Sequence, residues 1–176
     1  MSGSSRRRDE IGGLRVLAHP LRLRLLSLLT GTAYSAAEAA RALGESQPNV
    51  SYHLRRLHAA GLVDAVGEVT VRGGTAKRYR HDPDSGELLT AGSSREYAVV
   101  AAALADELRR RAAERDPARD GALTDAEVWL APEVWEDVRE RAARLGEELH
   151  AHALPPDTPG AVRVGATVVL FPMDQR

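Results

Sequence analysis

Residues 43–63 read LGESQPNVSYHLRRLHAAGLV, and the pattern of this segment indicates the fold class. Ser46 is a suitable N-cap for a helix, Pro48 fits its first turn, and Gly61 can end it. Between the two ends, apolar residues recur at a helical spacing that places them on one side. The pattern predicts an amphipathic helix over about 46–60 whose buried stripe consists of Val50, Leu54 and Leu57.

A second short helix precedes this one. Ser35 and Glu38 have the spacing of a capping box, in which each side chain accepts a hydrogen bond from the other residue's backbone amide. Gly44 can adopt the left-handed conformation that ends helices. Two short helices joined by a tight turn that contains glycine form a helix-turn-helix motif. The leucine pattern upstream predicts two more helices, over about 11–18 and 20–29.

The hydrophobic period changes after residue 61. Short runs rich in β-branched residues, separated by a Gly-Gly pair, predict a β-hairpin over about 66–81. Tyr79 lies between Arg78 and Arg80, so in a strand we expect Tyr79 to pack inward and both arginines to face out. A hairpin that follows a helix-turn-helix is called a wing, and this one carries four basic residues: Arg72, Lys77, Arg78 and Arg80.

The exposed face of the helix over 46–60 is rich in hydrogen-bonding groups. In the DNA major groove, asparagine and glutamine can pair with adenine edges, and arginine can pair with guanine. A merely solvated helix face is the alternative for each residue taken singly, but the adjoining basic hairpin favours DNA. The candidate DNA-binding residues are therefore Gln47, Asn49, Ser51, Tyr52, Arg55 and Arg56 on the helix, together with the four basic residues of the hairpin.

The charge distribution supports this interpretation. The chain of 176 residues has a net charge of -1, which by itself argues against a nucleic-acid partner. Residues 1–90 contain 13 basic and 9 acidic residues, a net charge of +4, whereas residues 91–176 have a net charge of -5. Because charge acts over about 8 Å at physiological salt, the local excess matters more than the sum. The positive half contains the helix-turn-helix and the hairpin.

A family resemblance also supports the interpretation as a DNA-binding protein. Residues 43–63, with the upstream LAHPLRLRLL at 17–26, resemble the recognition segment and opening helices of arsenic-repressor-like (ArsR-like) winged helix-turn-helix regulators. The resemblance covers about residues 11–82. It implies a homodimeric DNA-binding transcriptional regulator, here expected to be a repressor that binds a palindromic operator. The helix over 46–60 would enter the major groove, and the wing would contact the backbone or minor groove.

Two departures limit what the resemblance implies. Metal-sensing members of the family use cysteines on the third helix, or aspartate and histidine on a C-terminal dimerisation helix. This chain has no cysteine, and the helix expected over 93–115 has no histidine. We therefore predict no metal and no cofactor. A Gly-rich phosphate loop and a nucleophile with a matching base are also missing from the sequence, so we expect no enzymatic activity.

The second half of the chain is less informative. We expect the alanine-rich helix over 93–115 to form the dimer together with the first helix. Beyond it, alternating residues at 126–130 and 162–170 flank an amphipathic helix over about 132–150, which predicts a strand-helix-strand appendage. The alternative for the second strand is a place in the dimer interface. The appendage contains Trp129, Trp135 and Phe171, which are either its core or the lining of a small-molecule effector pocket.

The expected fold class is mainly α with a small β wing (α+β). The chain divides into a tail over 1–10, a winged helix-turn-helix domain over 11–90, and a dimerisation and candidate effector segment over 91–176. No apolar run is long enough to span a membrane, so a cytoplasmic protein is expected. The alternative to DNA binding is a winged helix that serves as a protein-protein interaction module.

Overall fold

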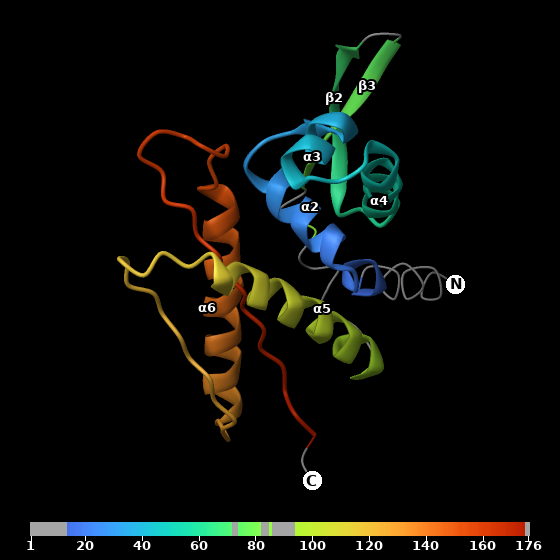
Figure 1. The fold of residues 1–176 in the computed structure, drawn as a ribbon. Helices are drawn as coiled ribbons and strands as arrows, with labels where there is room; N and C mark the ends of the chain where they lie inside the picture. The colour runs from blue at the N-terminus through green and yellow to red at the C-terminus, as the bar shows by residue number, and fades with distance from the viewer. Residues whose placement is uncertain (1–13, 72–73, 82–84, 86–93, 175–176) are drawn as a thin grey trace, which may run out of the picture.

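The computed structural model describes residues 14–71, 74–81, 85 and 94–174 (Figure 1). The expected tail over 1–10, the start of the first helix and Arg72 lie outside these residues. Residues 14–17 are helical. The elements that follow are α2 (Pro20–Gly31), β1 (Tyr34–Ser35), α3 (Ala36–Leu43), α4 (Gln47–Ala59), β2 (Val63–Val71), β3 (Gly74–His81), α5 (Ser94–Ala113) and α6 (Pro132–Ala151).

The helix-turn-helix consists of α3 and α4. The predicted capping box is confirmed: the Ser35 amide donates to Glu38 Oε2 at 2.7 Å, and the Glu38 amide donates to Ser35 Oγ at 3.3 Å. Gly44 follows α3 with a φ of 68°, the left-handed conformation that glycine adopts without strain. Local sequence signals therefore set the start of α3 and the turn that leads into α4.

The three strands form one antiparallel sheet in the order β1-β3-β2. The hairpin of β2 and β3 is the predicted wing, and it projects beyond the helices (Figure 1). A register shift between Ala65 and Gly67 interrupts the ladder of this hairpin. Strand β1 has only two residues, too few for an alternating pattern, so it was not predicted. The chain folds as a winged helix-turn-helix, as expected.

One hydrophobic core holds the helices and the wing together. Leu25 and Leu29 of α2 and Leu57 of α4 are fully buried in it, and Val63 at the start of β2 joins them. Helix α5 packs against α2, and its Val100 belongs to the same core. The core thus fixes the orientation of α4 relative to both the wing and α5.

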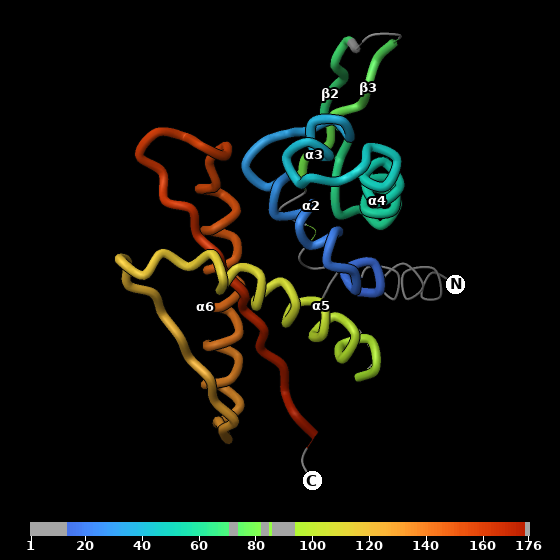
Figure 2. The backbone as a smooth tube through the Cα atoms, in the orientation of Figure 1, coloured from blue at the N-terminus to red at the C-terminus, as the bar shows by residue number. Residues whose placement is uncertain are grey.

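The two strands of the predicted strand-helix-strand appendage are wrong. Helix α6 is present, but residues 120–131 and 161–174 form no strand, and Figure 2 shows them as irregular traces that run past α6, away from the sheet. Alternating residues form a strand only when a neighbouring strand accepts and donates the backbone hydrogen bonds. Neither segment has such a neighbour within the described chain.

The residues after α5, 116–174, are called the C-terminal arm below. A few contacts attach the arm to the rest of the chain. A side chain at Gly31 would place its Cβ 2.5 Å from the Leu154 carbonyl oxygen, so glycine permits this close approach. The guanidinium of Arg111 donates to the Ala166 carbonyl oxygen at 2.9 Å. Arg163 pairs with Glu114 at 2.7 Å. These contacts position the arm, but they cover little of its apolar surface.

Candidate nucleic-acid interface

Helix α4 has one buried and one exposed face. Ser46 caps its N-terminus by accepting a hydrogen bond from the Asn49 amide at 3.4 Å. The predicted stripe is buried, with Val50 and Leu57 at 0% exposure and Leu54 at 1%. Because α4 is held to the core along this stripe, its other face is turned to solvent in a fixed orientation.

The structure places the candidate residues of α4 together on that solvent face. Tyr52 is 51% exposed, and Ser51 is half-buried at the edge of the face. The remaining four are exposed: Gln47, Asn49, Arg55 and Arg56. This face presents amide, hydroxyl and guanidinium groups on one helix, the chemistry that reads base edges and binds phosphates.

The turn before α4 is fixed by charged groups that sequence reasoning did not single out. Arg24 of α2 donates to the Leu43 carbonyl oxygen at 2.8 Å and to Glu45 Oε1 at 3.5 Å. Glu45 in turn accepts a hydrogen bond from the Asn49 side-chain amide at 3.3 Å. One candidate base-reading residue therefore already has an exposed hydrogen-bond partner one helical turn away, and a base edge would have to compete with Glu45 for Asn49.

A histidine pair lies beneath the exposed face. The rings of His19 and His53 have centroids 4.4 Å apart, and His53 is only 5% exposed. His19 also caps α2, because its Nδ1 accepts a hydrogen bond from the Leu21 amide at 3.2 Å. Burial, followed by the positive charge of neighbouring Arg22, lowers the pKa of His19. Burial also lowers the pKa of His53, and the nearby His19 and Arg22 add to the effect.

This pair predicts a pH-dependent stability. The folded state has lowered histidine pKa values, so the unfolded chain binds these protons more readily than the folded chain does. Stability is then fully present above the ordinary histidine pKa of 6.5 and is lost as the pH falls through the lowered values. We expect the thermal midpoint to fall by a few degrees between pH 7.5 and pH 5.5. Scanning calorimetry across this range measures it.

A His53→Leu variant tests the cause of this pH dependence. The charged groups around the pair, Arg22, Glu45 and Arg56, remain in this variant. The fall in midpoint between pH 7.5 and pH 5.5 should be smaller than in the unmodified chain, whatever the absolute stability of the variant. An equally steep fall would show that the acid sensitivity arises elsewhere.

Among its described residues, the wing exposes two basic side chains. Lys77 and Arg80 are exposed, but the strand register places Glu68 opposite Lys77 and Asp64 opposite Arg80. Arg72 lies outside the described residues. The alternation along β3 thus gives two exposed basic side chains, each with a carboxylate residue across the ladder.

The expected outward orientation is wrong for Arg78. Its guanidinium donates to the Ala33 carbonyl oxygen at 2.5 Å and lies 3.4 Å from Glu38 Oε2. Strand β1 pairs with β3 at this position, so the side chain meets α3 instead of solvent. Tyr79 packs against the core, as expected. Arg78 therefore joins the wing to the N-terminus of α3.

The three candidate effector residues are not gathered into a pocket. Trp129 is 82% exposed, Trp135 is half-buried, and Phe171 is 54% exposed with its ring 6.3 Å from that of Tyr97. The two exposed rings also do not form a core for the arm. An effector site at these residues stays a prediction.

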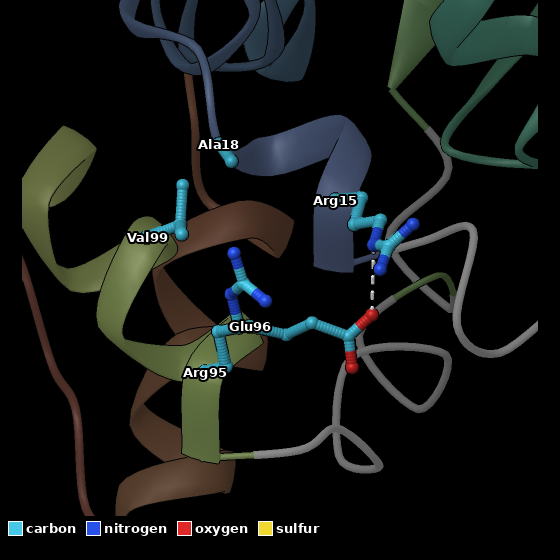
Figure 3. Close-up of a pocket in the computed structure, with 5 residues that line it drawn as sticks. All are labelled: Arg15, Ala18, Arg95, Glu96 and Val99. Carbon is cyan, nitrogen blue, oxygen red and sulfur yellow. Dashed lines mark ion pairs between the residues drawn. The ribbon is translucent and has the colours of Figure 1, made fainter.

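A shallow groove lies elsewhere, between residues 14–18 and the N-terminal part of α5 (Figure 3). It has a volume of about 310 Å³, and Arg15 pairs across it with the buried Glu96 at 3.0 Å. Its lining consists of Arg15, Ala18, Arg95, Glu96 and Val99. The groove therefore belongs to the surface that we expected to form the dimer, and none of the three aromatic residues lines it.

The described residues also bear on metal binding and on membrane insertion. They contain no group of three or more histidine, aspartate or glutamate side chains placed to hold a metal ion. Among their helices, none combines the length and the apolar character that crossing a membrane requires.

The fold and the geometry of α4 define the class of protein as a winged helix-turn-helix. Comparison with protein families agrees: a family described as a helix-turn-helix domain matches residues 17–66. The match runs from just before α2 through α4 into β2. Comparison with curated proteins finds no match. The chain is thus similar to helix-turn-helix regulators over the segment that contains the candidate interface.

Proposed function

We propose that this chain is a homodimeric, sequence-specific DNA-binding transcriptional regulator that acts as a repressor. The observation that carries the proposal is α4, whose apolar face is fixed in the core while its hydrogen-bonding face is exposed. A helix held in this way can enter the major groove, which is wide enough to admit it. Arg55, Gln47 and Tyr52 are then the residues best placed to meet base edges or phosphates.

The wing contributes contacts to the DNA backbone or the minor groove. Lys77 and Arg80 carry this role among the described residues, and we include Arg72 from the sequence. Glu68 and Asp64 lie opposite these two cations in the strand register and reduce the local positive charge that a phosphate would meet. Arg78, bound to Ala33 and close to Glu38, supports the wing from its base.

Dimerisation provides the second recognition helix. We propose that residues 14–17 and α5 form the contact, since Val99 and Leu108 of α5 are 50% and 53% exposed. A two-fold dimer of this type places its recognition helices about 34 Å apart, one turn of DNA, and therefore binds a palindrome. In the proposed organisation, residues 11–90 bind DNA and residues 91–176 serve dimerisation and any effector.

Footprinting on the DNA upstream of the chain's own gene tests the proposal. We expect protection of a palindromic site, with an affinity that falls steeply as salt rises from 50 to 200 mM. Each phosphate contact contributes a slope of about -0.9 to the logarithmic salt dependence. A folded dimer that does not bind this DNA, or binds without salt dependence, would contradict the proposal.

The alternative is a winged helix used for protein contact. The carboxylate residues opposite Lys77 and Arg80 favour it, because they reduce the positive charge of the wing. The two functions differ in their dependence on Arg55. Replacement of Arg55 should abolish tight DNA binding, whereas a protein partner that docks on the wing should be little affected.

A further inference from the structure

Helix α6 carries an apolar stripe with a regular spacing. Its apolar residues follow one another at intervals of three and four, the pattern along which two helices pack together. No residue of α6 is buried, although the helix has 20 residues. Helices in proteins obtain most of their stability from the packing of such a stripe. The stripe consists of Trp135, Val138, Ala142, Leu145 and Leu149.

The stripe is half-buried at Trp135, Val138 and Ala142 and exposed at its two leucines, and the rest of the C-terminal arm exposes further apolar side chains. Of the 19 exposed large apolar side chains among the described residues, 15 lie between residues 123 and 173. On α6 itself, Leu145 is 46% and Leu149 is 38% exposed. Such a concentration of exposed apolar side chains in one segment indicates a surface that another molecule covers.

The total exposed surface of the chain is larger than that of a compact monomer of the same mass. The chain exposes 12964 Å², whereas a compact monomer of 19.0 kDa exposes about 8400 Å² by the usual scaling with mass. A stable interface of standard size buries about 800 Å² on each partner. The excess is thus several times what one dimer interface needs, and the described part of the C-terminal arm, without a buried side chain, contributes to it.

The charges on α6 indicate which class of molecule can cover the stripe. Helix α6 contains six acidic and three basic residues, and the arginines pair within the helix, as in Arg139 with Glu136 and Arg144 with Glu140. At 100° per residue, the acidic residues lie on the side opposite the stripe. An acidic helix is repelled by DNA and by anionic lipid. The stripe therefore fits an apolar protein surface. Its spacing of three and four residues matches the spacing of the same stripe on a second copy of α6.

We propose that α6 packs along its stripe against α6 of a second copy of this chain. The proposal rests on the proposed homodimeric regulator and adds a dimer contact beyond residues 14–17 and α5. An isologous contact uses the same patch on both copies, which one self-complementary stripe provides. In Figure 1, α6 and α4 lie on opposite sides of the molecule, so this contact leaves α4 free for DNA.

Cross-linking tests the contact in the full-length chain. Because the chain contains no cysteine, a Leu145→Cys variant has a single thiol on the stripe, and an Ala143→Cys variant has one on the opposite, exposed side. We expect a short bismaleimide to convert Leu145→Cys to covalent dimer at least about tenfold faster than Ala143→Cys. Equal rates for the two variants would overturn the proposal.

Sedimentation equilibrium distinguishes this proposal from the function it rests on. A Leu145→Glu and Leu149→Glu double variant should raise the dimer dissociation constant by about tenfold or more, and Ala143→Glu should leave it unchanged. An unmodified chain that is monomeric at micromolar concentration would overturn both the contact and the homodimer. A double variant that remains fully dimeric and binds the footprinted DNA would overturn the α6 contact alone.

Discussion

Replacement of Arg55 by alanine is expected to lower the affinity for the footprinted DNA by about tenfold to 100-fold. Arg55 is exposed near the middle of α4, and the segment around it is held by the fully buried Leu57 and Val50. A guanidinium that contacts a guanine or a phosphate contributes about 1 to 3 kcal/mol to binding. Fluorescence anisotropy with a labelled duplex that contains the protected site measures the change.

Arg139→Ala is the matched control for this prediction. Arg139 is also an exposed arginine on a helix, but it lies on α6 and pairs with Glu136. The Arg139→Ala substitution removes the same charge from the chain and leaves α4 unchanged. Equal losses of affinity in both variants would indicate a general effect of net charge, and an unchanged affinity in Arg55→Ala would contradict the proposed recognition helix.

Replacement of Leu54 by alanine is expected to destabilise the fold by about 2 to 5 kcal/mol. Leu54 is 1% exposed and lies in the stripe that holds α4 to the core. The loss combines the transfer free energy of the removed methyl groups with the cavity that remains. Since single domains are stable by only about 5 to 15 kcal/mol, this loss removes a large part of the free energy of unfolding. Urea unfolding followed by circular dichroism measures the change.

Leu123→Ala provides the comparison, because Leu123 is 93% exposed in the single chain. Exposed substitutions of this kind usually change stability by about 0.5 kcal/mol or less. If Leu54→Ala unfolds at the same urea concentration as Leu123→Ala, the side chain of Leu54 does not hold α4 in place.

Much of the fold was predictable from local sequence signals. The capping box of Ser35 and Glu38 and the left-handed Gly44 act within a few residues, so their effect on the backbone is written in the sequence itself. The helix predicted over about 46–60 corresponds to α4, and the hairpin predicted over about 66–81 corresponds to most of β2 and β3. Periodicity is reliable here because the apolar stripe of α4 is fully buried.

The predictions that were wrong depend on neighbours distant in the sequence. The alternation at 126–130 and 162–170 resembles that of a strand, but no neighbouring strand completes its hydrogen bonds in the described chain. Arg78 was expected to face solvent, yet β1 brings Ala33 and Glu38 within its reach. The burial of His53 against His19 likewise arises from the packing of α4 beside the start of α2.

Local sequence signals account for the helix-turn-helix, the wing and the exposed polar face of α4, because caps, turns and periodicity act over a few residues. Contacts between segments distant in the sequence set the surroundings of the candidate groups on the wing. The pairing of β1 with β3 turns Arg78 toward Ala33 and Glu38, and the pairing of β2 with β3 sets a carboxylate residue opposite each exposed cation described in the wing. These outcomes depend on side chains that strand pairing and helix packing bring together from distant parts of the chain, and a linear pattern does not encode such distances.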